Sequence, residues 1–211
     1  MASFRLTQRQ WRIYLTVWLV ALAAVTGTLV GVAAPRLFAK PAPPAGLSGG
    51  VILKPSLPAP AFSLRDQQGA MISPSQLRGR VIALTFLDTQ CRDLCPLQAS
   101  LLGAVQSDLG PSAKFSVVIV SVRPEADTPS TIATFASSHG LKSGYYWLTG
   151  THQQLSSVWD SYGVGVQVAN GDLAHSSIIY LIDRSGHERV AFGDVPDVAS
   201  VENDVRVLEA G

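Results

Sequence analysis

The only two cysteines of the chain, Cys91 and Cys95, lie three residues apart, and Pro96 follows the second. Two thiolates at this spacing can chelate one soft metal ion or oxidise together to a disulfide. A bridge over so short a span would barely constrain the unfolded chain, so a purely structural disulfide is a weak explanation. The pair therefore predicts metal or redox chemistry.

The cysteines follow a short apolar run at 81–86, which has the pattern of a buried central strand, and they lead into a helix. Open α/β folds bind their ligands at this carboxyl edge of the sheet. The partial positive charge of a helix N-terminus lowers the pKa of a nearby thiol. We therefore expect both thiols at this edge, with lowered pKa values.

Elements of two kinds alternate along the rest of the chain. Expected strands lie at 81–86, 115–122, 145–148, 177–182 and 188–192, and expected helices begin after Pro96, at Thr128, at Thr151 and near Val198. The order predicts an α/β, thioredoxin-like domain. The extra helix before the 177–192 hairpin favours the larger, peroxiredoxin-like variant of that fold.

A third candidate ligand, His175, directly precedes this hairpin. In a thioredoxin-like sheet the loop before the hairpin approaches the loop after the first buried strand. His175 is therefore expected near the two sulfurs. Two thiolates and one imidazole suit Cu(I) or Cu(II), and they also suit Zn(II). The other histidines, His139, His152 and His187, are expected to be solvated.

The N-terminal part predicts a membrane anchor. Residues 13–34 contain no Asp, Glu, Lys or Arg, and a helix of this length covers the roughly 30 Å hydrocarbon core of a bilayer. Arginines before the run favour a cytoplasmic N-terminus and an extracytoplasmic domain. A cleaved signal peptide is the rival interpretation, but its apolar region should be shorter.

Four segments follow from this pattern: a cytoplasmic N-terminus at 1–12, a single-pass anchor at 13–34, a Pro- and Gly-rich linker at 35–60, and the thioredoxin-like domain at 61–211. The expected location is the cell membrane, with lipid as one partner. The net charge of +1 offers no basic surplus for binding nucleic acid.

Several motifs resemble the Sco/SenC family of copper-binding, thioredoxin-like proteins. The similar pieces are Cys-x-x-x-Cys-Pro at 91–96, the segments 121–129, 148–151 and 162–164, and His175 ahead of 179–183. The resemblance implies that Cys91, Cys95 and His175 bind copper destined for the CuA centre of cytochrome c oxidase, or for another cuproprotein. It implies a copper chaperone, which transfers an ion by ligand exchange and need not be an enzyme.

The chain departs from the family at three positions near these ligands. Arg123 and Ala174 stand where the family commonly has Asp, and Gln90 replaces a frequent aromatic residue or histidine. Groups around a metal site orient its ligands and tune its affinity. The departures therefore bear on copper affinity, redox poise and partner docking.

Two other classes of function use the same cysteines. An extracytoplasmic thiol–disulfide oxidoreductase would use Cys91 and Cys95 as attacking and resolving thiols and keep partner cysteines reduced, although such enzymes usually place two residues between them. A peroxiredoxin-like peroxidase would need Thr where the chain has Asp88, so this class ranks last. Asp127 is expected to start a helix, and Trp159 and Tyr162 to lie in the core.

Overall fold

The computed structural model describes Trp18 and residues 46–169 and 172–211. The chain divides into two compact units, 1–43 and 44–211, and the second holds the domain described below. Except for Trp18, the anchor predicted at 13–34 lies outside the described residues. Within those residues, no helix combines the length and the hydropathy that a membrane crossing needs.

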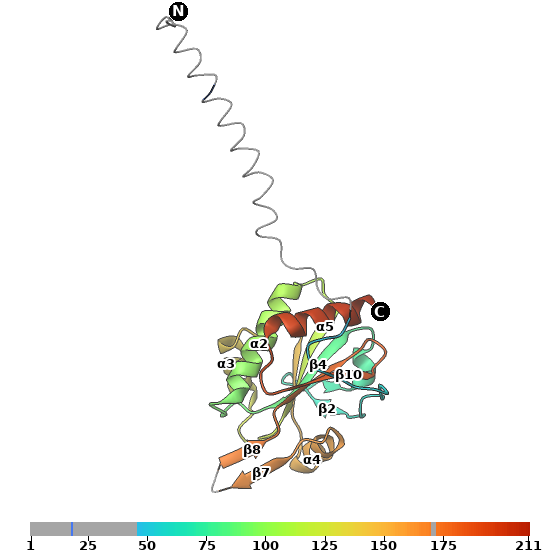
Figure 1. The fold of residues 1–211 in the computed structure, drawn as a ribbon. Helices are drawn as coiled ribbons and strands as arrows, with labels where there is room; N and C mark the ends of the chain where they lie inside the picture. The colour runs from blue at the N-terminus through green and yellow to red at the C-terminus, as the bar shows by residue number, and fades with distance from the viewer. Residues whose placement is uncertain (1–17, 19–45, 170–171) are drawn as a thin grey trace, which may run out of the picture. The chain divides into compact units, whose positions relative to one another are not determined.

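A six-stranded mixed sheet forms the centre of the domain (Figure 1). The strand order is β1 (Val51–Ile52), β10 (Glu188–Gly193), β9 (Ile178–Ile182), β4 (Val81–Leu87), β5 (Phe115–Ser121) and β6 (Tyr145–Leu148). β4, β5 and β6 run parallel, whereas β9 runs antiparallel to β4 and β10 antiparallel to β9. This arrangement is the one expected for a thioredoxin-like domain.

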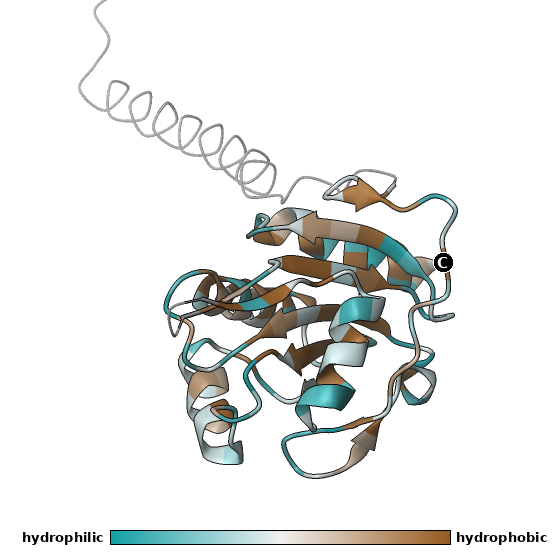
Figure 2. Cartoon of the chain, turned by 90° about the horizontal axis from the view of Figure 1, so that it is seen from below, coloured by the Kyte–Doolittle hydropathy of each residue, from teal (hydrophilic) through white to brown (hydrophobic). Residues whose placement is uncertain are grey.

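The two central strands are apolar because both faces of the sheet are covered. All seven residues of β4 and all seven of β5 are buried, and Figure 2 shows the strands of the central sheet as mostly hydrophobic. A continuous run of β-branched and apolar residues is the pattern of such strands. The register places Leu87 opposite Ser121, so both strands end at the same edge.

Each face of the sheet carries its own core. One core takes side chains from the helices α2 (Leu94–Leu109), α3 (Pro129–Ser138) and α5 (Val198–Ala210). The other takes side chains from α4 (His152–Ser161) and from the small hairpin of β2 (Leu64–Arg65) and β3 (Met71–Ile72), with the 3-10 helix η1 (Pro74–Leu77) beside it. Thr128 and Thr151 cap α3 and α4, as their sequence patterns predict.

Besides the β2–β3 hairpin and η1, the structure adds two features to the expected fold. Residues 46–60, assigned to the linker from sequence, contribute β1, which pairs with β10. A second hairpin, β7 (Val166–Ala169) and β8 (Asp172–His175), precedes β9 and lies beside α4 in Figure 1. The Asn-Gly sequence at 170–171 is a strong hairpin signal and could have predicted it.

Candidate functional site

The two cysteines lie where β4 gives way to α2. Cys95 is the second residue of α2 and is 1% exposed, whereas Cys91 lies in the preceding loop and is half-buried. Both are free thiols. This confirms the expected position at the carboxyl edge of the sheet, and it leaves Cys91 more accessible than Cys95.

The expected low thiol pKa is wrong for Cys95. Burial raises the pKa of Cys95 far above its ordinary value, and a hydrogen bond with the Cys91 side chain raises it further. The free-energy cost of removing the thiolate from water is larger here than the stabilisation that the partial charge at the start of α2 gives it. Cys95 is therefore a neutral thiol in the metal-free protein at neutral pH.

His175 is the last residue of β8, and its side chain reaches the thiol of Cys95. Its Nε2 lies 3.5 Å from Cys95 Sγ, a contact between residues 80 positions apart in sequence. Its Nδ1 lies 3.0 Å from the carbonyl oxygen of Ser176, and because a carbonyl only accepts, Nδ1 carries the proton. The lone pair of a neutral ring is then on Nε2, facing the sulfur, as in histidines that bind metals.

A buried glutamine joins the helix of the cysteines to the segment that follows His175. The amide nitrogen of Gln98 donates to Ser177 Oγ at 2.8 Å and to the carbonyl of Asp194 at 2.7 Å. Its amide oxygen accepts from the hydroxyl of Thr85, which lies on β4. Gln98 was missed from sequence, although it is a polar residue on the same helical face as the apolar residues Leu102 and Val105.

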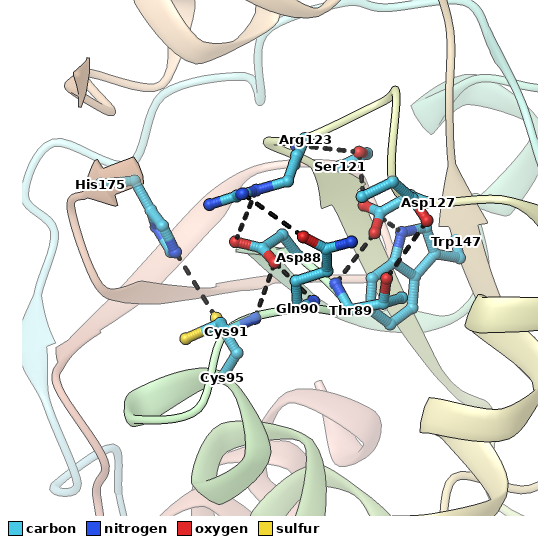
Figure 3. Close-up of polar contacts among 11 residues, drawn as sticks. Asp88, Thr89, Gln90, Cys91, Cys95, Ser121, Arg123, Asp127, Trp147 and His175 are labelled. Carbon is cyan, nitrogen blue, oxygen red and sulfur yellow. Dashed lines mark hydrogen bonds and ion pairs between the residues drawn. The ribbon is translucent and has the colours of Figure 1, made fainter. Parts of the chain in front are cut away.

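A carboxylate organises the loop just before Cys91. Oδ1 of the buried Asp88 accepts the backbone amides of Gln90 at 2.6 Å and of Cys91 at 2.7 Å. Its Oδ2 lies 3.7 Å from Nε of Arg123, whose Nη1 also approaches the side-chain oxygen of Gln90 at 3.5 Å. Two of the three departures from the family pattern, Gln90 and Arg123, therefore meet in one network with Asp88 (Figure 3).

Asp127 does not cap α3, contrary to the sequence-based expectation. Thr128 takes that role, and Asp127 is 4% exposed beneath the cysteine loop. It accepts hydrogen bonds from the Thr89 amide, the Ser121 hydroxyl and the Trp147 indole. Burial raises the pKa of Asp127, although these hydrogen bonds oppose the rise.

The other histidines lie away from the thiols in three different settings. His152 is exposed, with its ring against Trp159. His139 and His187 are half-buried rather than solvated: the ring of His139 packs on Phe135, and His187 Nδ1 lies 2.8 Å from Ser185 Oγ. Trp159 and Tyr162, each under 5% exposed, belong to the core as expected.

The contacts of the site bring two candidate metal ligands together, Cys95 and His175, but not a complete set of ligands. In the described part of the chain, no group of three or more His, Cys, Asp or Glu side chains is already arranged to hold a metal ion. Cys95 and His175 touch, whereas Cys91 is linked to Cys95 only through its effect on the pKa of the Cys95 thiol. The three-ligand set of Cys91, Cys95 and His175 therefore stays a prediction, and its donor types fit a soft ion such as copper.

The fold and the site together define a thioredoxin-like protein with two thiols at the start of a helix and a histidine brought to them from a hairpin. Residues 53–208 match the SCO1/SenC family. The chain belongs to this family.

Individual relatives agree with this assignment. An SCO2-like protein of Rickettsia felis is 31% identical over 134 residues, which cover 59% of this chain and 64% of the relative's length. Two solved structures are similar in fold. Copper-bound ScoI of Bradyrhizobium japonicum is 28% identical, with a TM-score of 0.64, and the match covers 72% of this chain and 99% of that one. Copper-bound ScoI of Arabidopsis thaliana is 25% identical, with a TM-score of 0.63, and the match covers 73% of this chain and 98% of that one.

Proposed function

We propose that this chain is a membrane-tethered copper chaperone that delivers copper to the CuA-type site of a respiratory oxidase. The observation that supports this most is the 3.5 Å approach of His175 Nε2 to Cys95 Sγ, because it joins two of the three proposed ligand side chains across 80 residues of sequence. The copper held by the similar Bradyrhizobium protein supports copper as the ion.

The proposed ligands are the thiolates of Cys91 and Cys95 and the imidazole of His175. Because the Cys95 thiol is protonated in the metal-free protein, copper must displace its proton on binding. Cys91 is the more exposed thiol, so an acceptor protein would reach it first. The ion then passes to the acceptor by exchange of one thiolate ligand at a time, with no net redox change.

The place of action is part of the same proposal. The uncharged run at 13–34 would hold the chain in the cell membrane as a single-pass anchor, with the N-terminus in the cytoplasm. The domain would then work on the extracytoplasmic side. The chain spans about two thirds of the length of the Rickettsia felis relative, 64% of it.

One observation favours a second function, thiol–disulfide exchange. Both thiols are free, the Cys91 side chain helps to raise the pKa of Cys95, and one thiol is half-buried while the other is buried. A more accessible attacking thiol beside a buried resolving thiol is the arrangement of a disulfide reductase. In this role the chain would keep the metal-binding cysteines of its partner reduced.

Copper binding by the reduced full-length chain in detergent separates the two functions. We expect one copper per chain, a thiolate-to-Cu(II) charge-transfer band, and a shifted band with weaker Cu(II) binding in His175→Ala. Because Cu(I) accepts two thiolates alone, His175→Ala should affect Cu(I) less. His152→Ala is the matched control and should behave as wild type, since its ring is exposed and rests on Trp159.

The opposite results have definite meanings. A His175→Ala variant that binds Cu(I) and Cu(II) as wild type does would exclude His175 as a ligand. A reduced wild-type chain that binds no copper but rapidly reduces a protein disulfide would establish the oxidoreductase function instead. A reduced wild-type chain that neither binds copper nor reduces a protein disulfide would contradict both functions.

A further inference from the structure

Basic side chains gather at the edge of the sheet opposite to the cysteines. Arg80 and Lys114 directly precede β4 and β5, and Lys142 lies shortly before β6. Arg184 follows β9, whose end pairs with the start of β4. We call this set, with the neighbouring Arg78, the basic edge: Arg78, Arg80, Lys114, Lys142 and Arg184.

The basic edge lacks partners of opposite charge. Within the described ranges, no ion pair joins any of its five members to a carboxylate. Arg189 and Arg206 near this edge, by contrast, pair with Asp183 and Glu202. Arg184 donates only to a backbone carbonyl, and its buried Nε has no hydrogen-bond partner. The edge therefore carries positive charge that the domain itself does not neutralise.

The surface at this edge is open to a ligand. Arg78, Lys114 and Lys142 are exposed. Arg80 and Lys142 line one hollow of about 330 Å³, and Arg184 lines a second of about 700 Å³. The first hollow offers the Lys142 ammonium beside backbone turns, which suits phosphate groups, although the Arg80 guanidinium there already donates to Ser116 and to the Phe115 carbonyl. In the second hollow Asp183 lies beside Arg184.

The domain also begins at this edge. Leu47, among the first described residues, lines the same hollow as Arg184 and the C-terminal Gly211. The predicted anchor ends at residue 34, so the intervening chain to residue 46 can span at most roughly 40 Å. A bilayer that held such an anchor would therefore stay within reach of the basic edge, at a high effective concentration.

We propose that the basic edge docks on anionic lipid headgroups of the membrane that carries the chain. Each Lys or Arg near an anionic leaflet strengthens binding about five-fold, so the three exposed members, Arg78, Lys114 and Lys142, are by themselves a substantial attraction. β4 separates this edge from the cysteine loop by seven residues, about 20 Å. Docking would therefore turn Cys91 and His175 away from the bilayer. The inference rests on the proposed tether for its bilayer, but the charge pattern belongs to the domain.

A purely structural explanation of the same residues exists. The carboxyl ends of α2 and α5 lie at this edge, and cations near helix C-termini are stabilising. That explanation predicts no response to lipid charge. The two explanations are therefore separable by experiment.

The test compares full-length chain in nanodiscs of phosphatidylcholine alone with nanodiscs that also contain phosphatidylglycerol. Hydrogen exchange of residues 109–115 and 183–188 should slow several-fold in the anionic discs and recover at high salt. The variant Arg78→Glu/Lys114→Glu/Lys142→Glu should lose this protection. Arg65→Glu, an exposed charge reversal near the other end of the sheet, should keep it. Equal exchange in both discs, or protection that survives in the triple variant, would overturn the proposal.

Failure of the tether gives a different result. A chain that does not enter nanodiscs lacks the anchor, and it should still sediment with phosphatidylglycerol vesicles in a salt-dependent way through the basic edge. If it does not, the docking proposal is wrong independently of the tether. Neither result changes the copper measurement, which is made in detergent.

Discussion

Arg123 and Asp88 face each other beside the cysteine loop, with Nε 3.7 Å from Oδ2. The other carboxylate oxygen of Asp88 holds the amide of Cys91. A pair formed by two loops therefore sets the backbone of the first cysteine. Arg123 is the cation that faces this buried carboxylate, whose other partners are backbone amides.

Coupling between these two residues is the first prediction. Arg123→Ala leaves the Asp88 charge buried without its cation. Because the Arg123 side chain is 21% exposed, the substitution should lower the free energy of unfolding by about 1–2 kcal/mol, less than the ~3–5 kcal/mol lost when a fully buried pair is broken. Asp88→Asn should recover part of this cost in the double variant. Urea unfolding of the four proteins measures the coupling, and strictly additive costs would show that the pair is not energetically linked.

Copper affinity should respond to the same pair. Residues that orient a ligand without touching the metal typically change affinity by about 10–100-fold. We expect Asp88→Ala, which removes the acceptor for the Cys91 amide, to weaken copper binding within this range. Lys54→Ala, at an exposed residue, is the control. Competition with a copper chelator measures both, and an unchanged affinity in Asp88→Ala would show that the loop does not depend on this carboxylate.

The oxidation state of the cysteines should gate copper binding. Thiolates are the proposed ligands, and a Cys91–Cys95 disulfide offers none. The oxidised chain should therefore bind little copper, and Cys91→Ser and Cys95→Ser should each lose most of the affinity. Copper content after desalting, measured in parallel with free thiols, tests this. Equal copper in the oxidised and reduced chains would remove the thiolates from the ligand set.

Gln98 should affect both stability and the metal site. Gln98→Leu keeps a similar volume but leaves the Ser177 hydroxyl and the Asp194 carbonyl without the amide donor, at a cost of about 1–3 kcal/mol. It should also loosen the segment after His175 and shift the Cu(II) charge-transfer band. Gln153→Leu, at an exposed position of α4, is the control. A destabilised variant with an unshifted band would restrict Gln98 to a structural role.

The elements of the core were predictable from sequence because their signals are local. The apolar runs of β4 and β5, and the capping patterns at Thr128 and Thr151, have a physical cause within a few residues. The class of fold followed from their order. The short strand β1 was not predictable, since its two exposed residues form a strand only through pairing with β10.

The positions of the candidate ligands were predictable from sequence, but the pKa of Cys95 and the hydrogen bonds around the site were not. The spacing of Cys91 and Cys95 gave their place at the strand end, and the expected nearness of His175 is confirmed by its contact with Cys95. The raised pKa of Cys95 depends on how deeply the first turn of α2 is buried, which spacing does not reveal. The roles of Asp127 and Gln98 likewise depend on contacts between distant segments.

Topology is tested by the position of the C-terminus. The anchor prediction expects a reporter fused after Gly211 to be active only if it works outside the cytoplasm, and it expects the mature chain to keep its N-terminus and fractionate with membranes. N-terminal sequencing and alkaline extraction check both points. A soluble, exported form that starts near Pro35 would show that the apolar run is a cleaved signal peptide.

Asp127 should make the domain less stable as the pH rises. Its pKa in the folded protein lies above the ordinary value of 3.8, so the folded state binds more protons than the unfolded state in the range above 3.8. Stability then falls with increasing pH until the folded carboxyl is fully ionised. Asp127→Asn cannot ionise, so this contribution to the pH dependence should vanish, although its amide nitrogen would face the Trp147 donor poorly. Urea unfolding of the reduced chain from pH 4 to pH 7 measures this. The free energy of unfolding of the wild type should fall relative to that of the variant as the pH rises. A constant gap across this range would mean that Asp127 titrates alike in the folded and unfolded chains.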